Sequence, residues 1–405
     1  MPELTRDPEL DSLVRELNEA TPAGELGGVS AEPTPQPSRP RRRRTAVVGD
    51  EPLRDLLSRV VERKGSDLLL VPGALPMMRL DGRLIALGGE RVQAAWLGDA
   101  FGPLLDDRLA GALDEAGFAD FSLNIAPSGA RFRVNLHRQR GALAASCRAL
   151  PSTIPTLAQL NLPPTWGELV QKTRGLVLVC GPAGSGKSST LAALLGEINT
   201  SRPCHVLTIE DPVEFEHRGE RALIEQIEIG TDTPSFALAL KAALRQAPDV
   251  LLVGEMRDLE TISMALTAAE TGHLVLSTLH THDAAQAIHR LIDVFPASQQ
   301  GQIRQQLALS LSAIICQQLV PRSDRPGRVP VVELLLATYA VRHHIRQDAM
   351  QKLHHEITLG KRLGMTSLEE SLARLVKAGV IQREEAEMRA TRSEELLSLL
   401  REGTP

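Results

Sequence analysis

Aromatic and cysteine side chains are scarce in this chain of 405 residues. Aromatic residues make up 2% of the sequence, which leaves few side chains on which the bases of single-stranded nucleic acid could stack. The four cysteines, Cys147, Cys180, Cys204 and Cys316, lie at least 24 positions apart. This spacing excludes a C-x-x-C zinc site and indicates no disulfide framework, so we expect reduced thiols in a cytoplasmic protein.

Long apolar runs and an excess of positive charge are lacking as well. No run approaches the ~20 apolar residues of a membrane helix, and the acidic, polar start MPELTRDPELDSLVREL is unlike a signal peptide. A net charge of −5 excludes a globally basic nucleic-acid-binding protein, although a local basic run occurs at 41–44. The length and the 42% of hydrophobic residues predict two or three domains with sizeable cores.

Composition divides the chain into four parts. Residues 1–47 are rich in proline and arginine, and we expect a disordered arm with a helix possible in its first twenty residues. The basic run Arg41–Arg44 would either touch an acidic membrane or nucleic acid, or belong to a solvated linker; a linker is favoured because basic runs are weak motifs. Residues 48–155 mix helical and alternating patterns and predict a small α+β domain.

The other two parts differ in pattern. Apolar strands alternate with helices over 156–337, which predicts an α/β domain with a parallel sheet and helices on its faces. We assign no element to most of 296–337. Residues 338–405 are helical in pattern, and a capping box at Ser367 and Glu370 starts one of these helices.

The strongest motif is GPAGSGKS, which lies between an apolar strand and a helix and matches the P-loop pattern. Its glycines let backbone N–H groups point at phosphate, and the helix N-terminus adds a partial positive charge. Lys187 would reach the β- and γ-phosphates of ATP, and the Ser188 hydroxyl would bind Mg²⁺. The predicted nucleotide-binding residues are Gly181, Pro182, Ala183, Gly184, Ser185, Gly186, Lys187, Ser188 and Ser189.

Acidic residues follow two further apolar strands. Glu255 follows the strand VLLV, where a carboxylate would lie near phosphates bound at the neighbouring strand end and could position or deprotonate water. Glu210, Asp211 and Glu214 follow HVLTI and could hold Mg²⁺ through water or the attacking water itself. The alternatives are a helix-capping acid for Glu255 and an acidic turn set by Pro212 for the second group.

Two histidines flank the strand in GHLVLSTLHTHDA. His273 begins it, His280 lies just beyond it, and a histidine beside the P-loop could contact the γ-phosphate; Thr278 could do likewise. The remaining histidines are treated as surface or packing residues: His282, His289, His343, His344, His354 and His355.

In their order along the chain, the P-loop, IEDPVEF, VGEMRD and GHLVLSTLHTHDA resemble the secretion-superfamily ATPases of type II secretion and type IV pili, and the chain is most similar to the PilT-like retraction branch. The resemblance implies a RecA-like ATPase domain, a PAS-like N-terminal domain and a ring of six subunits. It implies that Glu255 is the catalytic glutamate, that His280 contacts nucleotide, and that Arg131 and Arg133 neutralise phosphate charge, with Arg148 as a third candidate. The other interpretation of Arg131 and Arg133 is a solvated strand face.

The segment AVRHHIRQ, Ala340 to Gln347, resembles the retraction motif of that branch, with His343 and His344 where Asn and Leu are typical. Arg342 and Arg346 are four apart and share a helix face, so we expect them to couple hydrolysis to motion; an ordinary solvated face is the alternative. The resemblance further implies a PilC-like inner-membrane platform protein as partner, a possible paralogous motor, and peripheral association with the inner-membrane pilus machine.

Other functions remain open at this point. A PilU-like accessory motor is poorly separated by sequence, whereas pilus-assembly and type II secretion motors generally carry a tetracysteine zinc site that the spacing here excludes. A RecA-like nucleic-acid translocase has the acidic net charge and few aromatics against it, so we expect no nucleic-acid partner. A nucleotide-binding regulator without turnover would be expected to lack Glu255 or the arginines.

Overall fold

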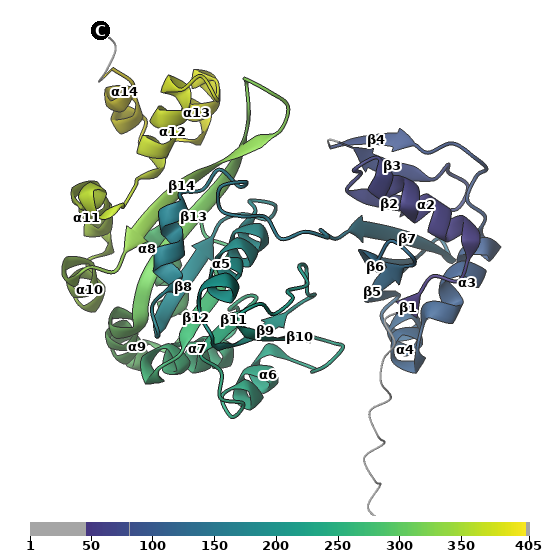
Figure 1. The fold of residues 1–405 in the computed structure, drawn as a ribbon, viewed down its shortest axis with the longest axis horizontal. Helices are drawn as coiled ribbons and strands as arrows, with labels where there is room; N and C mark the ends of the chain where they lie inside the picture. The colour runs from purple at the N-terminus through teal and green to yellow at the C-terminus, as the bar shows by residue number, and fades with distance from the viewer. Residues whose placement is uncertain (1–45, 81, 402–405) are drawn as a thin grey trace, which may run out of the picture. The chain divides into compact units, whose positions relative to one another are not determined.

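The computed structural model describes residues 46–80 and 82–401, which contain two seven-stranded sheets (Figure 1). Most of the expected arm, with its possible helix and Arg41–Arg44, lies outside the described residues. The last two residues of that arm form strand β1 (Ala46–Val47), which pairs in parallel with β5 (Phe118–Ile125). The N-terminal sheet therefore begins earlier than the boundary at 48, because the edge of β5 accepts this short strand.

The N-terminal sheet has the order β1-β5-β6-β7-β2-β3-β4 and is antiparallel apart from β1. Along β6 the buried Phe132, Val134 and Leu136 alternate with more exposed residues, as the period-two pattern predicts. Its other elements are α2 (Glu51–Glu62), β2 (Asp67–Leu70), β3 (Met77–Leu80), β4 (Arg83–Ala86), α3 (Ala94–Phe101), η1 (Gly102–Leu104), α4 (Asp107–Glu115), β6 (Ala130–Gln139) and β7 (Ala142–Ala149).

The second sheet has the order β10-β9-β11-β12-β8-β13-β14, and only β14 runs antiparallel to its neighbour. The prediction of a parallel sheet covered by helices is confirmed for this part of the chain. Its elements are η2 (Pro164–Val170), β8 (Gly175–Cys180), α5 (Lys187–Ser201), β9 (His205–Glu210), β10 (Leu223–Glu228), α6 (Phe236–Ala243), β11 (Val250–Val253), α7 (Leu259–Thr271), β12 (Leu274–Leu279), α8 (Ala284–Asp293), α9 (Ala297–Ser310), β13 (Leu311–Pro321) and β14 (Arg328–Leu336).

The two faces of this sheet are covered by different helices. One core joins β8 to α5 and η2, whereas the other packs α6, α7, α8 and α9 against the opposite face. Because β8, β9, β11 and β12 are parallel, their carboxyl ends lie at one edge of the sheet. The loops after these four strands are the ones on which ligands of open α/β sheets bind.

The C-terminal helices join two apolar clusters: the earlier ones, with Val341, Ile345 and Leu353, belong to the core that packs α6 to α9 against the sheet, and the later ones pack on the β13–β14 hairpin through a separate cluster that includes Val331, Leu372 and Leu396. They are α10 (Tyr339–Arg346), η3 (Met350–Lys352), α11 (Leu353–Leu359), η4 (Gly360–Leu363), α12 (Leu368–Lys377), α13 (Arg383–Arg389) and α14 (Ser393–Arg401). Across 46–80 and 82–401, no helix combines the length and apolar character that crossing a membrane requires.

Candidate active site

The loop between β8 and α5 has a conformation that requires glycine at two positions. Gly181 has φ +146°, and a Cβ added there would lie 2.2 Å from the Gln317 carbonyl oxygen. Gly186, the residue before α5, has φ +89°. A larger side chain would be strained at either position, so these glycines keep the loop pressed against β13.

Lys187 is the first residue of α5 and its side chain is largely buried. Its Nζ donates hydrogen bonds to the carbonyl oxygens of Gly181 (2.8 Å) and Pro182 (3.0 Å). Burial lowers the pKa of this ammonium group, while the nearby carboxylates Glu214 and Glu255 act in the opposite direction. The loop thus holds a cation at the point where a P-loop lysine meets phosphate.

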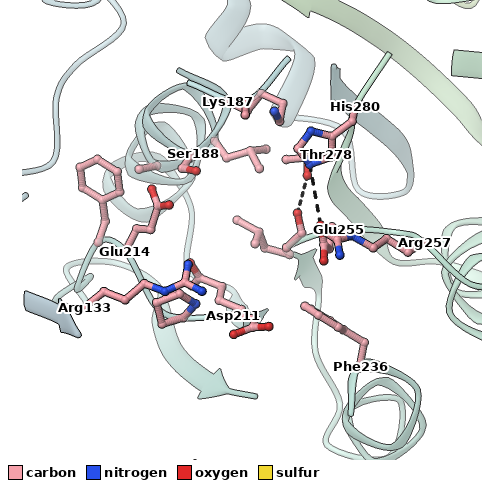
Figure 2. A pocket seen from close by; sticks show the side chains of 18 of the residues that line it. Arg133, Lys187, Ser188, Asp211, Glu214, Phe236, Glu255, Arg257, Thr278 and His280 are labelled. Carbon is pink, nitrogen blue, oxygen red and sulfur yellow. Dashed lines mark hydrogen bonds and ion pairs between the residues drawn. The ribbon is translucent and has the colours of Figure 1, made fainter. Parts of the chain in front are cut away.

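A cavity of about 460 Å³ opens beside the P-loop (Figure 2). It gathers residues from the carboxyl ends of β8, β9, β11 and β12, as the parallel sheet predicts. The predicted site residues that line it are Ala183, Gly184, Lys187, Ser188, Glu210, Asp211, Glu214, Glu255, Thr278, His280 and Arg133.

Glu255 lies between two cationic or titratable partners, as Figure 2 shows. Its Oε2 is 2.7 Å from Nε of Arg257 and 3.8 Å from Nε2 of His280. Partial burial lowers the pKa of His280, helped by the charges of Lys187 and Arg257 and opposed by Glu255. His280 is therefore neutral at neutral pH and can accept or donate one hydrogen bond.

The other candidates on β12 have separate surroundings. Thr278 donates its hydroxyl to the carbonyl oxygen of Gly254 at 2.6 Å, which ties the ends of β12 and β11 together. His273 precedes the amino end of β12, and its Nδ1 lies 3.1 Å from the Ala268 carbonyl oxygen. The strand separates it from the cavity, so His273 is not a site residue.

The acidic residues after β9 divide into two kinds. Glu210 accepts hydrogen bonds from Thr208 Oγ1 (2.7 Å) and Gln226 Nε2 (3.2 Å), and burial raises the pKa of its carboxyl group. Asp211 and Glu214 line the cavity. Glu210 therefore lines the cavity and also holds the ends of β9 and β10 together through its hydrogen bonds.

The three candidate arginines do not share one position. Arg133 lines the cavity. Arg131 donates a hydrogen bond to the Val213 carbonyl oxygen at 2.9 Å and pairs with Glu216 at 3.0 Å. Arg148 pairs with Asp67 within the N-terminal sheet at 2.9 Å, so Arg133 is the one of the three that the cavity includes.

Gln317 on β13 is a site residue that the sequence motifs do not indicate. Its Nε2 donates to the Ser185 carbonyl oxygen at 2.7 Å, and its Oε1 accepts from Thr190 Oγ1 at 2.8 Å. The side chain is 3% exposed. The sequence does carry one signal for this residue, which is the pair of amides inside the otherwise apolar strand LSAIICQQLVP. Buried polar groups need hydrogen-bond partners, so such amides indicate a specific contact.

The oxygen atoms around the cavity suit a hard cation. Ser188, Asp211, Glu214 and Glu255 offer hydroxyl and carboxylate oxygens, the ligands that Mg²⁺ prefers. In the part of the chain that the structure describes, no three His, Cys, Asp or Glu side chains are grouped to share a metal ion. This donor set fits Mg²⁺, which usually binds through one or two protein groups and substrate phosphates.

A P-loop at the carboxyl edge of a parallel sheet, with a carboxylate at the neighbouring strand end, defines a RecA-like P-loop ATPase. The model of the type II/IV secretion system protein family matches residues 154–404. The chain belongs to this family of ATPases.

Relatives of known name cover most of the chain. It is 43% identical over 321 residues to the twitching motility protein of Neisseria gonorrhoeae, covering 79% of this chain and 86% of the relative. It is 42% identical over 336 residues to the type IV pilus retraction ATPase PilT of Pseudomonas aeruginosa, covering 83% and 97%. A crystal structure of the pilus retraction motor PilT with bound ADP has a TM-score of 0.79 and 40% identity, covering 85% and 99%.

Proposed function

We propose that this chain is the ATPase motor of type IV pilus retraction, which drives twitching motility. The observation that carries the proposal is a single cavity that contains Lys187, Ser188 and Glu255, in a chain similar to PilT over more than four fifths of its length. ATP would bind through the P-loop amides and Lys187. Glu255 would then position and deprotonate the attacking water.

Magnesium would supply charge neutralisation at the phosphates. Ser188 would bind it directly, and the carboxylates of Asp211 and Glu214 would reach it directly or through water. His280, neutral and close to Glu255, would contact the γ-phosphate side of the cavity. Arg133 would add positive charge, and Arg131 would instead hold the loop that contains Val213.

Arg342 and Arg346 would couple hydrolysis to motion. Arg342 is half-buried; its guanidinium donates to the carbonyl oxygens of Ala308, Leu309 (2.7 Å) and Ala337 (3.0 Å), so it joins α10 to the end of α9. Arg346 lies close enough for its charge to lower the pKa of Arg342, after the larger effect of burial. We infer that this pair transmits helix movement and docks on an acidic surface. The alternative is that the two arginines only form a solvated helix face.

The assembly follows from the same proposal. The chain would form a homo-hexamer, dock on a PilC-like inner-membrane platform protein from the cytoplasmic side, and bind no nucleic acid. A paralogous motor of the PilU type is a further possible subunit. Deleting the gene and counting surface pili distinguishes a retraction motor from an assembly motor. Loss of retraction increases the number of pili, whereas loss of assembly abolishes them.

Two single variants test the chemistry. Lys187→Ala should abolish ATP binding, since this cation contacts phosphate in the ground state. Glu255→Gln should bind ATP but lose turnover by about 10²–10⁴, the typical effect of removing a general base. A fluorescent-nucleotide titration with a phosphate-release assay measures both, and near-normal hydrolysis by Glu255→Gln would reassign the base to Glu210 or Glu214.

A further inference from the structure

Glu333 is a buried carboxylate that the nucleotide chemistry above does not use. It lies within β14, opposite Cys316 of β13, and is 5% exposed. Its Oε1 accepts a hydrogen bond at 2.9 Å from the backbone N–H of Ala284, the first residue of α8. A strand of the hairpin therefore fixes the start of a helix that follows the nucleotide site.

The segment held by this hydrogen bond is short. Only four residues separate Leu279, the last residue of β12, from Ala284, and the first of them is His280. Asp283 caps α8 by accepting from the Gln286 N–H at 2.8 Å. The His280 loop is consequently anchored by β12 at one end and by Glu333 at the other.

A second buried carboxylate approaches Glu333 from the C-terminal helices. Glu369 on α12 is fully buried, and its Oε1 accepts from the backbone N–H groups of Thr391 (3.0 Å) and Arg392 (2.9 Å), which precede α14. Its Oε2 is buried and makes no hydrogen bond within the described residues. Helix α12 also contacts β14 directly, since the Val332 N–H donates to Ser371 Oγ at 3.2 Å.

We propose that Glu333 is a positioning residue that holds the His280 loop at the nucleotide site and makes its position depend on how α12 packs against β14. The inference rests on the proposed role of His280 in the nucleotide site. It connects the C-terminal helices to hydrolysis through two buried carboxylates, because ionising both would bring like charges together away from bulk solvent.

Protonation should tune this connection near neutral pH. Burial, with smaller contributions from the charges of Asp283 and Glu369, raises the pKa of Glu333 to about 7, although the Ala284 N–H and the Arg392 charge oppose the rise. The facing Cys316 thiol is itself held protonated, because burial raises its pKa. Since the native protein binds this proton more tightly than the unfolded chain, packing of α12 on β14 weakens as the pH rises through about 7.

Two substitutions separate the hydrogen bond from the charge. Glu333→Gln keeps a side-chain oxygen for the Ala284 N–H and cannot ionise, whereas Glu333→Leu removes the acceptor. Glu394→Gln, on the exposed first turn of α14, is the matched control. The assays are steady-state ATP hydrolysis between pH 6 and 8.5 and amide hydrogen exchange of residues 280–284.

In Glu333→Leu, the amide hydrogen of Ala284 should exchange at least tenfold faster than in the wild type. The substitution should lower kcat by a larger factor than it changes KM. The Gln variant should match wild type at pH 6 and keep its rate and protection at pH 8.5, where wild type loses part of both. Unchanged Ala284 exchange in the Leu variant, or a wild-type pH profile in the Gln variant, overturns the proposal. A His280→Ala variant with normal hydrolysis would refute only the role of His280, because the exchange measurement tests the anchoring independently.

Discussion

Replacing Gln317 by leucine tests how far the shape of the P-loop is imposed by the neighbouring strand. The amide of Gln317 makes two buried hydrogen bonds, to the Ser185 carbonyl and from the Thr190 hydroxyl. Leucine fills a similar volume but offers neither group. The loop carbonyl would be left without a donor at the back of the nucleotide site.

The expected magnitude follows from those two bonds. A buried polar group that loses its partner costs about 1–3 kcal/mol, so the loss of both bonds should lower the free energy of unfolding by about 2–6 kcal/mol. If about 1.4 kcal/mol of this destabilisation affects the loop conformation that binds nucleotide, nucleotide affinity falls roughly tenfold. The substitution should weaken nucleotide binding more than it slows hydrolysis, because it leaves Glu255 and His280 unchanged.

Gln318→Leu is the control, because the next residue along β13 points to the opposite face of the sheet. Urea unfolding and titration with a fluorescent ADP analogue measure the two effects. If Gln317→Leu binds ADP as tightly as Gln318→Leu, the P-loop holds its shape without help from β13 and the reasoning is refuted.

Three further outcomes are expected. The double variant Arg342→Ala/Arg346→Ala should keep most of its basal ATPase rate while cells accumulate pili and stop twitching; a collapse of purified ATPase activity, or normal motility, would contradict the coupling role. A truncated protein beginning at Thr45, which retains β1, should keep its assembly state and ATPase activity in sedimentation and hydrolysis assays, and a monomer would make the arm an assembly element. Because the pKa of His280 lies below its usual value, protonation should reduce hydrolysis only on the acid side of neutrality, and a His280→Asn variant should lose that acid limb; an unaltered limb assigns it to another group.

The sequence was sufficient for features whose chemistry is local. The P-loop, the carboxylate of Glu255 and most of the helix–strand order of 156–293 follow from short patterns, because each pattern encodes a turn, a strand end or a helix face. The edge strand β10 was not predicted. The hairpin β13–β14 was missed because both strands are buried on both faces, so their apolar runs carry no alternation that distinguishes a strand from a buried helix.

Residues whose role depends on distant partners were the hardest to predict. Gln317 meets Ser185 and Thr190 across more than 120 positions, which no motif spacing reveals. Arg131 and Arg133 lie on the same side of β6 and looked equivalent, yet one binds a backbone carbonyl and the other lines the cavity. Only the tertiary arrangement separates them.

The place of β8 in its sheet has a consequence for synthesis of the chain on the ribosome. This strand is the first of its sheet along the chain and is buried at all six positions. Its two neighbours in the sheet, β12 and β13, are made about 100 or more residues later. At about 5–20 residues per second, the ribosome needs roughly five to thirty seconds to make the neighbours of this apolar strand and of the P-loop. Nascent chains released before residue 317 would thus carry the complete P-loop sequence without a binding site for ATP, and would expose a strand suited to aggregation.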